Sequence, residues 1–90
     1  MKFAGSLKLM TSNDAIEYIE ECHSRGFRLL GVEGFIITEK GAFQPDQEAS
    51  NDIADGKIIK NNFMKATISL INKYPNHWFE VVHSNEQKVI

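Results

Sequence analysis

Among the side chains that could take part in binding or catalysis, the acidic ones are concentrated in one segment of this sequence. Residues 33–55 hold six of them against the single base Lys40, a net charge of −5 in a chain whose formal net charge is only −2. The six acids are Glu33, Glu39, Asp46, Glu48, Asp52 and Asp55. Carboxylates gathered in this way repel phosphate, attract cationic proteins and speed association with them. The acidic segment is therefore the first candidate for a binding surface, although each acid taken singly is most simply interpreted as ordinary surface charge.

Patterns that would indicate catalysis or metal binding are weak by comparison. Cys22 and His23 are adjacent, but neighbours on a helix point about 100° apart and do not face each other. Cys22 also falls on an apolar stripe, so we interpret it as a small buried hydrophobe. His77 and His83 would lie about 20 Å apart in a strand, too far to share one ion. We expect no catalytic residue, no metal and no cofactor.

The lysines of the last third of the chain do not indicate a nucleic-acid site. Most of them, such as Lys60, Lys65 and Lys73, decorate a segment with the period of a helix whose other face is apolar. A direct binder of nucleic acid normally carries a basic stripe, and the acidic segment opposes one. We therefore expect no direct contact with nucleic acid.

Length and composition indicate one small domain over residues 1–90, with an ordered core at about 12–84 and frayed termini. The hydrophobic fraction of 42% is ordinary for a globular chain. No apolar run approaches the roughly 20 residues that cross a membrane, and the first ten residues lack the apolar stretch of a secretory signal. A single cysteine fits a reducing compartment, so we expect a cytoplasmic protein.

A first helix is predicted at about 13–25. Thr11, Ser12 and Asn13 are good N-cap residues, and Thr11 with Asp14 fits a capping box. Apolar residues recur at helical spacing behind them, and Gly26 suits the left-handed position that ends a helix.

Residues 27–43 are rich in β-formers and punctuated by glycines, and two registers fit them. Strands at 27–32 and 35–39 could be joined by a turn at Glu33-Gly34, or one bent strand could lead into a hairpin at Glu39-Lys40-Gly41. The sequence does not choose between them. No helix opens after Gly31 and Gly34, so we expect them to permit tight packing or a bulge and not to hold a phosphate.

The remaining segments are predicted as a loop, a helix and a strand. Residues 44–57 are the most polar stretch and are expected to form a long surface loop. A second helix should cover about 58–74 and end before Pro75, with Asn61-Asn62 as an alternative, later cap. A strand follows at about 77–83, and the polar tail beyond it should fray. The predicted fold is therefore α+β, a two-layer sandwich of order α-β-β-α-β. Its sheet is mainly antiparallel with three strands or slightly more, and both helices cover one face.

Four segments of the chain resemble the small immunity proteins with which bacteria neutralise their own toxins. They are AIEYIEECHSRGF, LLGVEGF, NNFMKATISLINKY and HWFEVV, which together span about residues 15–83. The likeness lies in element order, length and the glycine-bearing strand, and it is greatest to the partners of tRNA-cleaving colicins and of contact-dependent growth-inhibition toxins. The resemblance implies a protein without catalytic activity that plugs the active site of a cognate toxin, with acidic and aromatic side chains in place of RNA phosphates and bases.

These features together predict a cytoplasmic immunity protein that blocks a basic nuclease, an RNase or tRNase, without a cofactor. Carried over to this chain, the resemblance implies that the six acids of residues 33–55 meet the toxin's lysines and arginines, and that Phe43 and Trp78 are apolar anchors. The expected partner is a cationic toxin domain, bound by a monomer or weak homodimer away from any membrane. The alternatives are a small homodimeric regulatory domain, and a small enzyme or ligand-binding domain that uses His77, His83 or the carboxylates.

Overall fold

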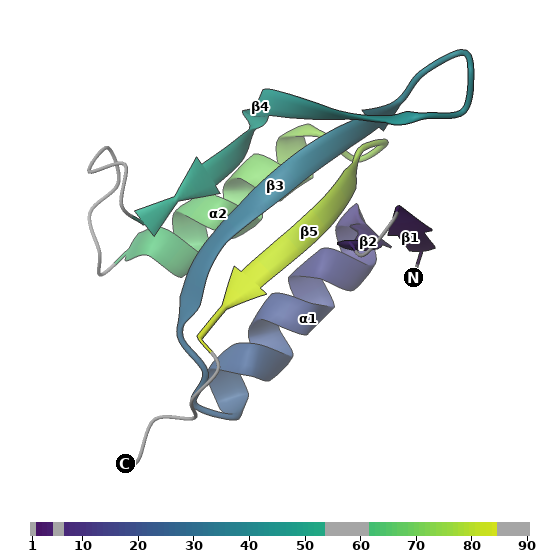
Figure 1. The fold of residues 1–90 in the computed structure, drawn as a ribbon. Helices are drawn as coiled ribbons and strands as arrows, with labels where there is room; N and C mark the ends of the chain where they lie inside the picture. Colours follow the sequence, from purple (N-terminus) through teal and green to yellow (C-terminus); the bar gives the residue numbers. More distant parts are fainter. Residues whose placement is uncertain (1, 5–6, 54–61, 85–90) are drawn as a thin grey trace.

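The computed structural model describes residues 2–4, 7–53 and 62–84 (Figure 1). Their elements are β1 (Lys2–Ala4), β2 (Leu7–Thr11), α1 (Ser12–Ser24), β3 (Leu29–Ile37), β4 (Phe43–Asp52), α2 (Phe63–Lys73) and β5 (Trp78–His83). The described strands form an antiparallel open sheet of order β1-β2-β5-β3-β4. The protein is a small α+β domain, as expected, but the predicted order α-β-β-α-β omits β1 and β2.

The last strand, β5, lies in the middle of the sheet. It pairs with β2 on one side and β3 on the other, both antiparallel. β2 and β3 are therefore parallel to each other with β5 between them, and α1 connects them. By the same reasoning α2 connects β4 to β5 across β3. The strands that pair with β5 are therefore far from it in the sequence, and each parallel pair is joined through a helix.

The first helix follows its prediction closely. Thr11 is its N-cap, and the Thr11 Oγ1 accepts a hydrogen bond from the Asp14 backbone N–H at 3.2 Å. The helix begins one residue earlier than predicted and ends at Ser24, one residue earlier. Gly26 has the expected left-handed conformation, with φ +83°.

The glycine-bearing region is one long strand followed by a hairpin, so the register with two strands at 27–32 and 35–39 is wrong. β3 continues through Glu33 and Gly34 to Ile37. The turn closes with hydrogen bonds from the Thr38 N–H to the Ala42 carbonyl and from the Gly41 N–H to the Thr38 carbonyl, each 2.8 Å. Gly41 supplies the positive φ, +81°, that the second register required of it.

The predicted loop over 44–57 is wrong for the part that the structure describes. Residues 43–52 form β4, which in the described part of the chain pairs only with β3. An edge strand covered on one side can carry polar residues at most positions, and Pro45 is tolerated there because the edge N–H needs no partner. Residues 54–57 lie outside the described residues.

Gly31 and Gly34 permit close approach of β4, as predicted. A Cβ on Gly34 would lie 2.5 Å from the Ala49 Cβ, and one on Gly31 would lie 2.6 Å from the Asn51 carbonyl oxygen. The pairing of β3 and β4 shifts between Val32 and Gly34, where β4 bulges. Ser50 closes this bulge, because its hydroxyl donates to the Asp46 carbonyl and accepts from the Gly34 N–H.

The second helix begins at Phe63, and the predicted positions 58–61 lie outside the described residues. Asn62 occupies the N-cap position of the later start, but its side chain makes no capping hydrogen bond. The helix ends before Pro75, as expected, and β5 begins at Trp78, one residue later than predicted. Residues 85–90 of the predicted frayed tail also lie outside the described residues.

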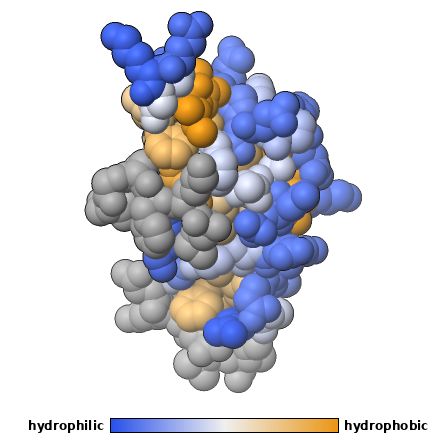
Figure 2. Space-filling view, turned by 90° about the vertical axis from the view of Figure 1, so that its right-hand side faces the viewer, coloured by the Kyte–Doolittle hydropathy of each residue, from blue (hydrophilic) through white to orange (hydrophobic). Residues whose placement is uncertain are grey.

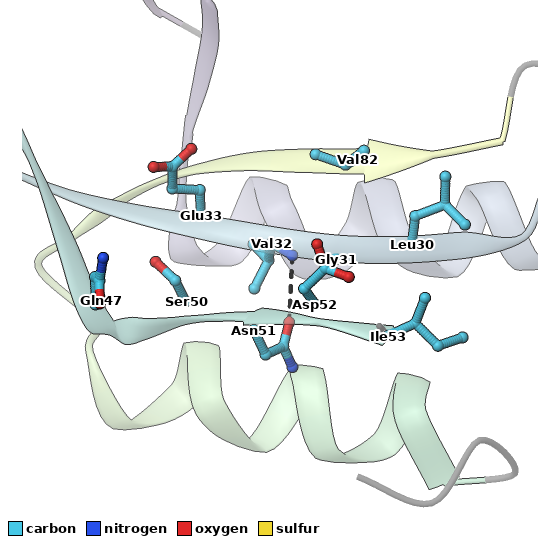
Figure 3. A pocket seen from close by; sticks show the side chains of 10 residues that line it. All are labelled: Leu30, Gly31, Val32, Glu33, Gln47, Ser50, Asn51, Asp52, Ile53 and Val82. Atoms are coloured by element: carbon cyan, nitrogen blue, oxygen red, sulfur yellow. Dashed lines mark hydrogen bonds between the residues drawn. The ribbon is translucent and has the colours of Figure 1, made fainter. Parts of the chain in front are cut away.

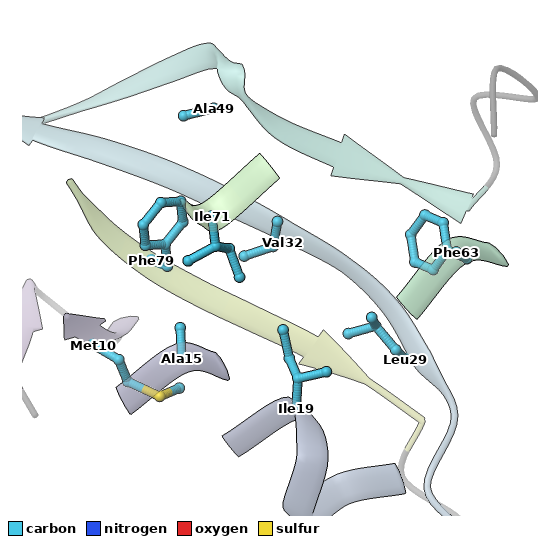
Figure 4. Close-up of a cluster of buried hydrophobic side chains, with 9 residues drawn as sticks. All are labelled: Met10, Ala15, Ile19, Leu29, Val32, Ala49, Phe63, Ile71 and Phe79. Atoms are coloured by element: carbon cyan, nitrogen blue, oxygen red, sulfur yellow. The ribbon is translucent and has the colours of Figure 1, made fainter. Parts of the chain in front are cut away.

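Both helices contribute to one hydrophobic core on the same face of the sheet (Figures 1 and 4). Its buried members are Met10, Ala15, Ile19, Leu29, Val32, Ala49, Phe63, Ile71 and Phe79. One polar network crosses it. The buried Thr67 hydroxyl donates to the Phe63 carbonyl, the Asn51 side-chain amide donates to the Thr67 oxygen at 2.8 Å, and the Asn51 Oδ1 accepts from the Val32 N–H. This network joins α2, β4 and β3, which fixes the position of the edge strand.

Candidate binding surface

The sheet face that points away from the helices carries the most distinctive group of side chains. The register places Val32 opposite Val81, which packs against the core, and places Glu33 opposite Glu80. Because strand side chains alternate between faces, Glu33 and Glu80 project together from the other side. Asp52 lies opposite Gly31 on the same face. We call the face that bears Glu33, Asp52 and Glu80, with Phe43 and Trp78 beside them, the acidic sheet face.

Glu33 and Glu80 form a like-charged cross-strand pair. Both are half-buried. Burial raises the pKa of the Glu80 carboxyl, and the negative charge of Glu33 raises this pKa further. Neither carboxylate makes an ion pair within the described part of the chain. Like charges directly opposite each other destabilise a sheet, so the free protein carries a local energetic cost that an incoming cation would relieve.

An aromatic pair lies next to the acids. The rings of Phe43 and Trp78 meet edge-to-face, with centroids 6.3 Å apart and an interplanar angle of 80°. They come from β4 and β5, which flank β3. Their contact therefore passes over Phe35, a residue of β3 that lies opposite Trp78 and is itself almost fully buried. The two rings are therefore held in position before any partner arrives.

An open groove of about 570 Å³ lies over β3 and β4 beside the bulge (Figure 3). Glu33 and Asp52 line it, together with Leu30, Gly31, Val32, Gln47, Ser50, Asn51, Ile53 and Val82. Val82 leaves 42% of its surface exposed. The groove thus joins apolar side chains to the acids on one face.

The structure separates the other predicted site residues from this face. Asp46 lies opposite Gly34, on the helix side, and its Oδ2 is 2.9 Å from His77 Nε2. This hydrogen bond, with a second from the Glu48 N–H, lowers the pKa of Asp46 although partial burial opposes the shift. Asp46 therefore serves the fold by tying β4 to the start of β5.

Two of the remaining acids are exposed and one is not described. Glu39 lies in the hairpin turn between β3 and β4, and Glu48 lies in the bulge of β4. Asp55 lies outside the described residues. Of the seven predicted residues that the structure describes, Glu33, Phe43, Asp52 and Trp78 gather on the acidic sheet face.

Sequence reasoning missed Glu80. It lies outside the acidic segment, but the period of two in Trp78-Phe79-Glu80-Val81-Val82 places Trp78, Glu80 and Val82 on one face. That signal was present in the sequence. The register that sets Glu80 against Glu33 was not, because the two residues come from strands with no local connection.

His77, His83 and Cys22 are occupied in structural contacts. His83 Nδ1 lies 2.7 Å from the Ser84 carbonyl oxygen, so Nδ1 carries the proton and the Tyr18 hydroxyl donates to Nε2 at 2.8 Å. Cys22 is buried, and burial raises the pKa of its thiol. Within the described residues, neither His77 nor His83 is hydrogen-bonded to a Ser, Thr or Cys side chain. In the same residues no three His, Cys, Asp or Glu side chains could hold a metal ion together.

The surface visible in Figure 2 is mostly hydrophilic where the residues are described, with hydrophobic residues in small separate patches. No helix in the described ranges has the length and apolar character needed to cross a membrane. A comparison with protein-family models found no match, and a comparison with curated protein sequences found none either.

Proposed function

We propose that this protein is a cytoplasmic immunity protein that binds a cognate basic nuclease toxin, an RNase or tRNase, and blocks its active site through the acidic sheet face. The observation that carries the proposal is the Glu33–Glu80 pair, two half-buried carboxylates without an ion-pair partner among the described residues, beside a fixed aromatic pair. These side chains are complementary to a cationic groove that binds RNA.

A ribonuclease must bind the phosphates and bases of RNA. Its active site holds phosphates with lysine and arginine side chains and often stacks bases on aromatic rings. Carboxylates on a rigid sheet compete for the same cations, while aromatic residues such as Trp78 supply the anchors that dominate many interfaces. Because the sheet fixes the backbone positions of these residues in advance, binding does not have to order the backbone that carries them.

The proposal predicts that a nuclease toxin is encoded beside the gene, and co-expression with that toxin tests it. Cells that carry the toxin and the wild-type protein should grow, whereas the double variant Glu33→Lys/Glu80→Lys should fail to protect them. The matched control is Glu17→Lys, a charge reversal at an exposed position of α1. Death of cells that carry the wild-type protein would refute the immunity function.

Purified proteins provide the second measurement. Charge steering predicts that the association rate with the toxin domain falls markedly between low and high salt. Sedimentation at micromolar concentration separates a monomeric inhibitor from the alternative, a homodimeric domain that uses the same face for its own contact. An association rate that does not change with salt would contradict binding through the acids.

A further inference from the structure

The groove on the acidic sheet face is divided along its length. Leu30 and Ile53 lie at one end, Glu33, Gln47 and Ser50 lie at the other, and Val82, Gly31 and Asp52 lie between them (Figure 3). One end is therefore apolar, and the other offers the Glu33 carboxylate and the Gln47 amide beside the Ser50 hydroxyl, whose proton is already donated to the Asp46 carbonyl. Its size is within the range of about 300–1,000 Å³ typical of small ligand sites.

Gly31 keeps the middle of this groove open. It has no side chain, and the β4 backbone lies so close that a Cβ there would be 2.6 Å from the Asn51 carbonyl oxygen. The strand spacing that shapes the groove therefore depends on residues that the hydrogen bonds of Asn51 already hold in place. The backbone that underlies the groove is therefore set by the pairing of β3 with β4.

We propose that this groove receives the side chain of an arginine presented by the partner, with the aliphatic stem along Leu30 and Val82 and the guanidinium at Glu33. The partner's identity rests on the proposed function, but the groove's preference for arginine follows from its own lining. Glu80, directly opposite Glu33 on β5, adds a second negative charge at the same end.

Three features favour arginine over other occupants. The carboxylates exclude anions, and a purely apolar ligand would leave Glu33 covered without a hydrogen-bond partner. A long cationic side chain buries its stem on apolar surface and extends its head to acceptors. The planar guanidinium donates several hydrogen bonds in a fixed fork, which suits acceptors on two neighbouring strands better than the single ammonium of lysine does.

The experiment titrates the ¹⁵N-labelled full chain at low salt with N-acetyl-arginine methylamide and follows the backbone amide signals by NMR. The lysine and citrulline derivatives are the comparison probes, because citrulline has nearly the shape of arginine without its charge. We expect saturable shifts centred on Gly31, Glu33 and Val82 with arginine, weaker binding of lysine and no binding of citrulline. Glu33→Gln should weaken arginine binding about tenfold, as expected for a lost charge-assisted hydrogen bond, while Glu17→Gln should leave it unchanged.

Several results would overturn this assignment. Equal binding of citrulline or lysine would remove the role of the guanidinium, and unchanged affinity in Glu33→Gln would remove the role of the groove's acidic end. The probes need no toxin, so the two proposals fail separately. If the protein protects cells from the toxin but does not bind arginine saturably, only the groove assignment is wrong. If it binds arginine but does not protect the cells, only the immunity function is wrong.

Discussion

The substitution Glu80→Gln should stabilise the free protein. It removes one charge of the cross-strand pair and keeps the size and half-buried position of the side chain. Cross-strand pairs contribute roughly 0.2–1 kcal/mol, and like charges placed directly opposite destabilise. Solvent screens a pair that is only partly buried, so we expect a gain in the lower half of this range. For a domain of this size about 0.5 kcal/mol corresponds to a Tm increase of roughly 2–4 °C.

The dependence on pH tests whether the negative charge of Glu80 is the source of this cost. The folded state raises the pKa of Glu80 above its usual 4.5, so the folded protein holds this proton more tightly than the unfolded chain. The stabilisation that this protonation provides is complete below pH 4.5 and is lost as pH rises through the folded pKa. The advantage of Glu80→Gln should therefore be near zero at low pH, grow above pH 4.5 and level off once the pair is fully charged.

Urea unfolding monitored by Trp78 fluorescence, repeated at several pH values, measures this difference. Glu17→Gln is the control, since Glu17 is exposed on α1 and outside the pair. A Glu80→Gln variant that is less stable than wild type at pH 7, or whose advantage is the same at every pH, would refute the reasoning.

Three further predictions concern packing, a hydrogen bond and the thiol. Gly34→Ala should lower the free energy of unfolding by about 1–3 kcal/mol, because the added methyl group overpacks against Ala49. Gly41→Asn, at a positive φ with open space around it, should lower it less. Equal losses in urea unfolding would contradict the close packing. Asp46→Asn should make the protein less stable than wild type at neutral pH, and this difference in stability should disappear as pH falls through the lowered pKa of Asp46. A difference that persists at low pH would exclude the His77 hydrogen bond as its source. Cys22, with 6% of its surface exposed, should react with iodoacetamide far more slowly in the native protein than in urea, and equal rates would show that the thiol is accessible.

The local signals in the sequence were sufficient for α1, for the end of α2 and for the glycines. Thr11 and Gly26 act on neighbouring residues, so their meaning does not depend on the rest of the fold. Gly31 and Gly34 likewise indicated close packing before their partner strand was known. The α+β class follows from these elements, because two amphipathic helices must bury their apolar stripes on a sheet.

Only the tertiary structure decided which acids share a face. Strand residues alternate, so a shift of one position moves a side chain to the opposite side of the sheet. The polar composition of 43–52 concealed an edge strand, and its bulge turned Asp46 toward His77 while Asp52 remained on the acidic sheet face. Glu80 joined Glu33 because β5 inserts between β2 and β3. The sequence by itself determined that acids are abundant near β3, but register, which depends on contacts between distant segments, selected the pair.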